Sequence, residues 1–332
     1  MTLLGTLLNI TNFRNPFLRT LIPSVGAAFA IQSAVAIPSI FAQSERFYDL
    51  SGSLTYLSVT ALSLYLPTLR ARAAASLAGT AKPAFPKLID AFNGKGGANG
   101  LNWRQVVLSA AVGIWATRLG TYLFQRVLAD GKDSRFNEIK KSPSKFFGAF
   151  MAQATWVSLC LMPILALNSI PHTLLSTLPA LALTDILGLL LYAGGITFEA
   201  IADRQKSAWV DAKKNKEHEE DFLTHGLWSK SRHPNYFGES TLWTGIAVTS
   251  AGVLASNVGQ IGMGLASSAS GVGLLGRGLG IGMAAISPAF VTFLLLKVSG
   301  VPLSEKKYDK KYGDRKEYKK WKEETPMFIP KL

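Results

Sequence analysis

Seven long stretches with few charged side chains are the feature that most limits how this chain can fold. Each is near or above the roughly 20 residues that a helix needs to cross a bilayer. They cover residues 18–42, 50–69, 105–128, 146–168, 173–200, 240–258 and 278–298. A chain that is 48% hydrophobic, with its charges collected between such stretches, is typical of an integral membrane protein. We therefore predict an all-α, polytopic membrane bundle of about seven transmembrane helices.

The remaining composition fits this prediction. Proline occurs inside several stretches, for example at Pro38, Pro67 and Pro163, and membrane helices tolerate it because neighbouring groups satisfy the backbone. The net charge of +14 lies mostly between or after the stretches, which indicates anionic lipid headgroups and the bilayer, not nucleic acid, as its partner. The single cysteine, Cys160, excludes an intramolecular disulfide and a cysteine-based metal site, and no metal site is predicted.

The organisation follows from these stretches. Residues 1–44 form an N-terminal segment with the first membrane helix, and residues 45–332 form one membrane domain with a motif core at 198–245. The tail 299–332 is strongly charged with interleaved aromatics, so it could fold back against the membrane face.

Seven spans with the basic tail in the cytosol put four polar segments on the cytosolic side: 43–49, 129–145, 203–239 and 299–332. These segments carry most motif-like residues, so we predict a cytosolic cofactor-binding face. The loop 70–104 falls on the opposite side although it carries several basic residues, which leaves a re-entrant piece or a different span count open.

The densest motif is Gly-Leu-Trp-Ser-Lys-Ser-Arg-His-Pro-Asn-Tyr-Phe-Gly-Glu at residues 226–239. If a helix starts at Pro234, Asn235 and Glu239 lie one turn apart on one face. Arg232 and His233, just before it, supply donors for phosphate or carboxamide oxygens. The competing interpretation is a basic juxtamembrane segment that anchors to lipid headgroups.

Charged residues inside two further stretches add candidates. Glu199, Asp203 and Lys206 lie at i, i+4 and i+7, on one helical face near a membrane boundary; an ordinary interfacial ion pair is the alternative. Arg118 lies within the span 105–128, where an ionisable side chain is costly and usually faces the bundle interior. We expect it to bind a phosphate or to pair with Asp133 or Asp49.

The 226–239 motif resembles the signature of the DUF1295 branch of the steroid 5α-reductase-like membrane proteins, to which sterol Δ14-reductases are related through their C-terminal core. Further blocks resemble the same branch in the same order. They lie at residues 45–53, 115–120, 133–136, 198–206 and 328–330.

The resemblance implies an NADPH-dependent reductase that transfers hydride to an activated C=C bond of a lipophilic substrate, in a multi-pass protein of the endoplasmic reticulum. It implies that Asn235 and Glu239 hold the nicotinamide end of NADPH and that Asp203 is an acidic cofactor contact. The other side chains that we assign to cofactor binding are Arg232, His233, Tyr236, Lys206, Arg118 and Arg135.

Catalysis requires a donor that polarises the substrate carbonyl while hydride reaches the β-carbon. Related steroid reductases use a Glu and a Tyr from the N-terminal half, and Glu45, Tyr48 and Asp49 are the clustered candidates here. The pattern around them departs from that of the steroid enzymes, so it does not specify the substrate.

Two other functions stay open. Isoprenylcysteine carboxyl methyltransferases, which use S-adenosylmethionine, carry a similar Arg-His-Pro-x-Tyr-x-Gly block. They present a Glu-Glu pair soon after the last helix, where this chain has Glu305 followed by Lys306. The other alternative is a non-catalytic membrane protein on the same scaffold.

Overall fold

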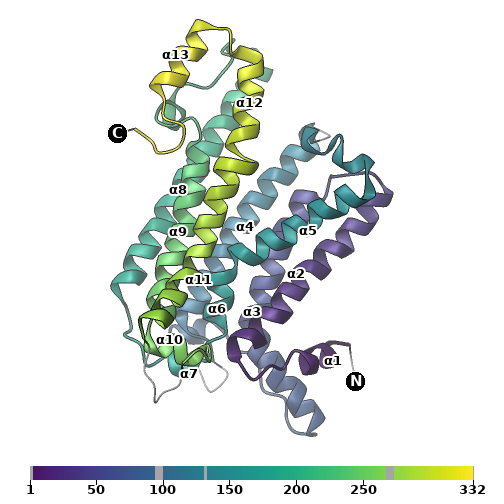
Figure 1. Ribbon diagram of the computed structural model, residues 1–332, viewed down its shortest axis with the longest axis vertical. Coiled ribbons are helices and arrows are strands. Elements are labelled where there is room, and N and C mark those ends of the chain that lie inside the picture. The colour runs from purple at the N-terminus through teal and green to yellow at the C-terminus, as the bar shows by residue number, and fades with distance from the viewer. Residues whose placement is uncertain (1–2, 94–99, 131–132, 267–272, 332) are drawn as a thin grey trace. The chain divides into compact units, whose positions relative to one another are not determined.

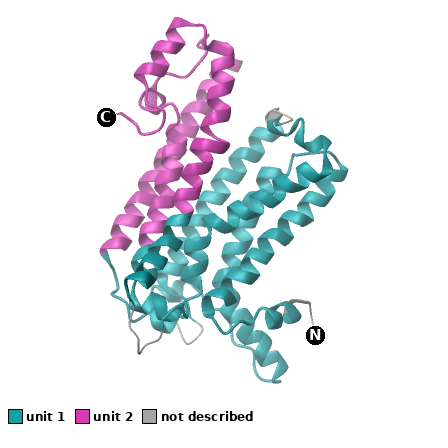
Figure 2. Cartoon of the chain, viewed as in Figure 1, with its two compact units in different colours: residues 1–182, 250–286 teal, residues 183–249, 287–332 magenta. Residues whose placement is uncertain are grey.

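The computed structural model describes residues 3–93, 100–130, 133–266 and 273–331, and the regular secondary structure in these ranges is helical (Figure 1). The helices form two compact units, which we describe separately (Figure 2). Unit 1 comprises residues 1–182 and 250–286, and unit 2 comprises residues 183–249 and 287–332. The predicted all-α class is confirmed for the described part of the chain.

Unit 1 is built around four long helices, α2, α3, α4 and α5, joined by short ones. In chain order its helices are α1 (Leu3–Ile10), α2 (Pro16–Phe41), α3 (Tyr48–Leu77), η1 (Leu88–Ala91), α4 (Trp103–Asp130), η2 (Ser134–Phe136), η3 (Ile139–Lys141), α5 (Pro143–Cys160), α6 (Met162–Asn168), α7 (His172–Leu175) and α10 (Asn257–Gly262). Helix α3 packs against α4 and α2, and α2 also packs against α5.

The interior of unit 1 contains many small and polar side chains. The buried face of α2 recurs every three or four residues and consists of Thr20, Ser24, Ala28, Gln32, Ala36 and Ser39. Gln32 Nε2 donates to Thr55 Oγ1 on α3 at 2.8 Å, and Ser51 Oγ lies 3.3 Å from Gln153 Oε1 on α5. Small residues and interhelical hydrogen bonds hold helices together where the surroundings are as apolar as the side chains.

Unit 2 contains α8 (Leu183–Lys214), the 3-10 turn η4 (Gly226–Ser229) and the first part of α9 (Pro234–Leu254). It ends with the last part of α11 (Leu274–Phe293), the π-helical segment η5 (Leu294–Val298), α12 (Val301–Tyr312), α13 (Lys316–Glu324) and a short tail. Helices α9 and α11 both continue across the unit boundary.

Helices α8 and α9 approach each other closely through glycines spaced seven residues apart. A Cβ built on Gly195 of α8 would lie 2.4 Å from the Leu242 backbone nitrogen, and one on Gly238 of α9 would lie 2.6 Å from that of Glu199. Gly188 and Gly245 repeat the arrangement one heptad further along the antiparallel pair. Because no side chain fits between the two backbones, glycine is required at these positions.

The seven predicted stretches all coincide with helices, but the count of seven spans is not confirmed. Among the described residues, four helices are long and apolar enough to cross a membrane. They are Pro16–Phe41, Trp103–Leu128, Leu183–Lys214 and Leu274–Tyr312. The pair α5 and α6, bent by 54° where Pro163 follows the break, would make a fifth. The chain is thus a helical protein with the features of a multi-pass membrane protein.

Several predicted boundaries were wrong. The span predicted to begin at residue 173 begins at Leu183, because α7 ends at Leu175 and Pro179 precedes the long helix. Helix α3 continues to Leu77, so Arg70, predicted to lie in a loop, is helical. Its Nη2 donates to the backbone carbonyls of Thr11 and Arg19 at 3.0 Å. Residues 94–99 of the predicted loop lie outside the described residues.

Adding a methyl group at the α8–α9 contact tests its importance. We expect Gly195→Ala to destabilise the protein by about 1–3 kcal/mol, because the methyl group would overlap backbone atoms that cannot rotate away. Thermal unfolding in detergent measures this effect. Gly194→Ala is the matched control, since a Cβ there meets nothing within 4 Å. Equal melting temperatures for both variants would contradict the close-packing interpretation.

Candidate functional site

The predicted helix start at Pro234 is confirmed, and it places Asn235 and Glu239 on successive turns of α9. Proline is well suited to a first helical position, where its missing N–H is not needed. Ser231 shapes the approach: its hydroxyl accepts the His233 backbone N–H at 3.1 Å and donates to the Phe328 carbonyl at 2.8 Å. The side chain of Glu239 is buried.

Arg232 and His233 converge on one carboxylate, that of Glu305 on α12. Arg232 Nη1 lies 2.7 Å from Glu305 Oε2, and His233 Nε2 lies 3.1 Å from Glu305 Oε1. Lys322 Nζ of α13 lies 2.9 Å from Glu305 Oε2. Glu305 is therefore the centre of a charge cluster that joins the motif to the C-terminal helices.

The C-terminal tail folds back onto the same segment; that it lies against the membrane face stays a prediction. The Arg232 backbone N–H donates to the Pro326 carbonyl at 2.9 Å, and the Lys331 N–H donates to the Lys230 carbonyl at 2.9 Å. The ring of Phe328 packs edge-on against Phe237 of α9, with centroids 5.7 Å apart. These contacts fix the tail on the residues that precede Pro234.

Helix α8 supplies the other side of the cluster. Lys206 Nζ lies 4.7 Å from the centre of the Trp228 ring, a cation–π distance. Trp228 Nε1 donates to the Ala202 carbonyl at 3.0 Å, and Gln205 Oε1 accepts the Leu227 N–H at 2.9 Å. Glu199 and Asp203 are buried on the same helix. The turn η4 is thus fastened to α8, directly ahead of the Arg-His pair.

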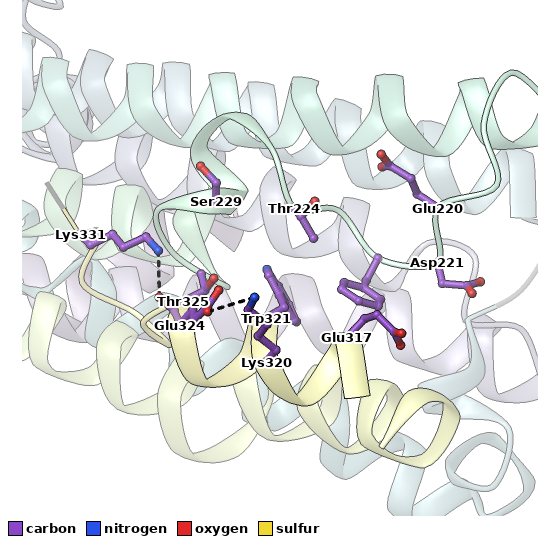
Figure 3. A pocket seen from close by; sticks show the side chains of 11 residues that line it. Glu220, Asp221, Thr224, Ser229, Glu317, Lys320, Trp321, Glu324, Thr325 and Lys331 are labelled. Atoms are coloured by element: carbon purple, nitrogen blue, oxygen red, sulfur yellow. Dashed lines mark hydrogen bonds and ion pairs between the residues drawn. The ribbon is translucent and has the colours of Figure 1, made fainter. Parts of the chain in front are cut away.

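Two cavities adjoin this cluster. A small cavity of about 20 Å3 is lined by twelve residues: Lys206, Trp209, Phe222, Leu223, Trp228, Arg232, His233, Ser304, Glu305, Tyr308, Tyr318 and Trp321. An open cleft of about 510 Å3 lies between the 220–229 segment and α13 with its tail (Figure 3). Phe222 and Trp321 line both, and their ring centroids lie 5.2 Å apart.

Two polar atoms of the motif are buried without a hydrogen-bond partner in the described part of the chain: Arg232 Nε and Asn235 Oδ1. Buried polar atoms are almost always hydrogen-bonded, and an exception calls for an explanation such as a ligand. A guanidinium nitrogen donates and an amide oxygen accepts, so the two atoms fit a ligand that carries both an anionic group and an N–H group.

The predicted catalytic residues lie in unit 1, where each has a partner. Glu45 Oε2 lies 2.7 Å from Lys140 Nζ, and Glu45 Oε1 accepts the Asp133 backbone N–H at 3.0 Å. Tyr48 Oη donates to the Ala149 carbonyl at 3.0 Å. Asp49 pairs with Arg135 at 3.1 Å. These contacts join the 43–49 segment to the 133–141 segment and to α5.

Burial raises the pKa of the Glu45 carboxyl, but the Lys140 ammonium and the Asp133 N–H together outweigh burial and leave the pKa below its usual value. Glu45 is therefore ionised at neutral pH. In this arrangement it is a charged anchor of unit 1.

Most of the predicted cofactor residues come together in unit 2. Asn235, Glu239, Arg232, His233 and Tyr236 belong to the α9 start, and the rings of His233 and Tyr236 stack at 5.3 Å. Asp203 and Lys206 lie on α8. Arg118 lies on α4 and Arg135 on η2, both in unit 1, and Arg135 pairs with Asp133 and Asp49. Asp49 also lies 4.0 Å from Arg126, and the pairing of Arg118 with Asp133 or Asp49 stays a prediction.

A family model described as protein of unknown function (DUF1295) matches residues 87–277 and 271–325, which include α8, the motif and α12. The chain belongs to the DUF1295 family. No curated protein and no solved structure matches the chain. The motif resemblance at 226–239 is thereby confirmed at the level of the family.

Sequence reasoning missed three parts of this DUF1295 site. Glu305 was noted only as a departure from the methyltransferase pattern, although it contacts both Arg232 and His233. Lys322 and Gln205 were not singled out. Glu305 carried one usable signal: it is the only acid in the first eight residues of the basic tail.

Removing Lys140 tests the anchoring role of Glu45 in this DUF1295 protein. We expect Lys140→Met to lower the free energy of unfolding by about 1–3 kcal/mol, because a buried carboxylate loses its counter-charge. Chemical denaturation in detergent measures the change. Lys141→Met is the matched control, since the Lys141–Glu138 pair is largely exposed and such pairs contribute little. Equal losses in both variants would contradict a buried anchor.

His233 predicts a pH dependence of stability. Burial lowers its pKa below the usual 6.5, more strongly than the Glu305 carboxylate raises it, and Lys206 and Arg232 lower it further. As pH falls below 6.5, the unfolded chain binds this proton more readily than the folded one, so stability decreases; above that pH the contribution is fully present.

Unfolding midpoints measured from pH 7.5 to 5 in wild type and in His233→Gln check this expectation. The wild type should lose more stability on acidification than the variant. Parallel curves would show that His233 does not carry the effect.

Proposed function

We propose that this DUF1295 protein is an integral membrane NADPH-dependent oxidoreductase that reduces an activated C=C bond of a lipophilic substrate, a sterol, steroid or enoyl lipid. Its place in the endoplasmic reticulum, with the charged C-terminal face in the cytosol, belongs to the same proposal. The basis is the chemistry of the donors and acceptors at the start of α9, together with the resemblance of the motif blocks to steroid 5α-reductase-like proteins.

One observation carries the proposal: the amide oxygen of Asn235 is buried and lacks a partner among the residues described. A nicotinamide carboxamide presents an N–H donor and a C=O acceptor, which an asparagine amide can match with its own two groups. Glu239, one turn along α9, adds a buried carboxylate. The residues at this position therefore fit the nicotinamide end of the cofactor.

The cations beside Asn235 fit the cofactor's phosphates. Arg232 offers a planar fork, and Lys206 adds a point charge on the wall of the same small cavity. Asp203 lies buried on α8, three residues before Lys206. The arrangement gives a basic end and an amide end, as a dinucleotide with an anionic and an uncharged part requires.

NADPH, when bound, supplies a hydride. The residues of the chain would hold its carboxamide at Asn235 and Glu239 and its phosphates at Arg232 and Lys206. Glu45, Tyr48 and Asp49 remain the proposed carbonyl-polarising group. Tyr48 is the best donor among them, because its hydroxyl carries a proton at neutral pH, which it donates to the Ala149 carbonyl in the described structure.

A second candidate is supported by the position of Glu305. An acid that follows the last long helix and contacts the Arg-His pair resembles the methyltransferase arrangement, although Lys306 stands where that family has a second Glu. An S-adenosylmethionine-dependent methyltransferase would bind that ligand through the same Arg232 and His233 side chains. Thermal stabilisation of the purified protein separates the candidates: NADPH alone stabilises a reductase, and S-adenosylmethionine alone would overturn our proposal.

Substitutions at the amide end test cofactor binding directly. We expect Asn235→Ala and Glu239→Ala each to weaken NADPH binding about tenfold, the cost of losing a hydrogen bond in a buried site. Calorimetry of the protein in detergent gives the affinities. Thr244→Ala on the same helix is the control, because its hydroxyl donates to the Ser240 carbonyl of its own helix at 2.7 Å. Unchanged affinity in both site variants would refute the assignment.

The reaction itself is tested by NADPH oxidation with a panel of sterols, enones and trans-2-enoyl lipids, followed by identification of the reduced product. Turnover of one class identifies the substrate. Binding of NADPH without oxidation across the panel would favour a non-catalytic protein on the same scaffold.

A further inference from the structure

Three donors meet at the Glu305 carboxylate, which is an unusual concentration for a single acid. Arg232 and Lys322 lie at 2.7 and 2.9 Å from Oε2, and the His233 imidazole lies at 3.1 Å from Oε1. The side chain of Arg232 is only 10% exposed and that of His233 only 6%. A buried fork with a neighbouring ammonium and imidazole is the donor set that binds phosphate in proteins.

The donors are not fully used by Glu305. Arg232 Nε is buried and has no hydrogen-bond partner among the described residues, although a guanidinium binds phosphate best with two nitrogens. Lys206 lines the same cavity from α8. This group could therefore hold an anion with more oxygen atoms than a carboxylate provides.

Glu305 and such an anion cannot occupy the site together. The small cavity of about 20 Å3 beside Glu305 has room for about one water molecule, not for a phosphate group. A phosphate beside the carboxylate would also place like charges in contact at a poorly solvated position, which is strongly unfavourable. The carboxylate has to move before a phosphate can reach Arg232.

The small cavity that Glu305 lines adjoins the open cleft. Phe222 and Trp321 line both spaces, and Trp321 lies at the centre of the cleft (Figure 3). Lys322, the next residue, pairs with both Glu305 and Asp309. Through Lys322, Glu305 thus contacts the helix that carries Trp321.

We propose that Glu305 is a built-in competitor for a phosphate-bearing ligand: its carboxylate occupies the anion site of Arg232, His233 and Lys322, and the ligand's phosphate replaces it. This inference rests on the proposed function in taking the NADPH phosphates as the natural occupant. It adds that α12 and α13 hold the site closed until an anion of this kind displaces Glu305.

Neutralising the competitor tests the proposal. The affinities of inorganic pyrophosphate and of NADPH are measured by calorimetry for wild type and Glu305→Gln in detergent. We expect the variant to bind both about tenfold more tightly, because ligand binding no longer requires displacement of the resident carboxylate. Weaker or unchanged binding of both would overturn the proposal, since it would mean that Glu305 orients Arg232 for the ligand or is irrelevant to it.

Glu323→Gln is the matched control, because it removes the same charge from an exposed position of α13 that lines neither cavity. Its affinity should equal that of wild type. An equal gain in the control would mean that the loss of any negative charge from α12 or α13 tightens anion binding, and it would overturn the proposal. If Glu305→Gln does not fold, Glu305→Asp, which shortens the reach of the carboxylate, replaces it: tighter pyrophosphate binding supports the proposal and weaker or equal binding overturns it.

The same experiment separates this inference from the proposed function. Tighter pyrophosphate binding in Glu305→Gln, with no NADPH binding in either protein, would support the competitor and reject the cofactor. NADPH binding in wild type without any gain in the variant would support the cofactor and reject the competitor. A further arm with phosphatidic acid in the micelle identifies the source of the phosphate: a gain for that lipid and for pyrophosphate, but not for NADPH, indicates a lipid headgroup.

Discussion

The glycine contact between α8 and α9 is the constraint on which the geometry of unit 2 depends. The two backbones touch at Gly195 and Gly238, which fixes the register of the two helices. The register in turn fixes the position along the helix axis of each polar side chain near the helix ends. Asp203 and Lys206 continue α8 beyond the contact, and Asn235 precedes Gly238 on α9. A bulkier side chain at either glycine would overlap the facing backbone and change the spacing of these groups.

The parts of the site that follow from local sequence could be predicted. Pro234 fixes a helix start, so the spacing of Asn235 and Glu239 on one face follows from helical periodicity. Glu305 could not be located in this way, because its partners Arg232 and His233 lie more than seventy residues earlier in the chain. Only the folding of α12 against the motif brings them together.

The long helices of the fold could also be predicted from local sequence, but not all of their ends. Apolar stretches of the right length identified each long helix, because burial or lipid contact requires that composition. Their ends were less certain: Arg70 looks like a loop residue from its charge, yet it is helical and hydrogen-bonds to the carbonyls of Thr11 and Arg19. The partner of Glu45 could not be predicted either, because Lys140 lies 95 residues further along the chain.

The energetics of the Glu305 cluster argue against a purely stabilising role. Taking a carboxylate and a guanidinium out of water costs several kcal/mol each, and well-packed apolar side chains often give equal or greater stability at such positions. A cluster kept only for stability would also leave no donor unused, whereas Arg232 Nε is buried without a partner in the described structure. An exchangeable anion accounts for both facts, because donors arranged for a phosphate exceed what one carboxylate can accept. Helices α12 and α13 then have two roles: they line the anion site, and they supply Glu305 and Lys322 to it. The hydrogen bonds between the tail and the residues before Pro234 hold these helices in place.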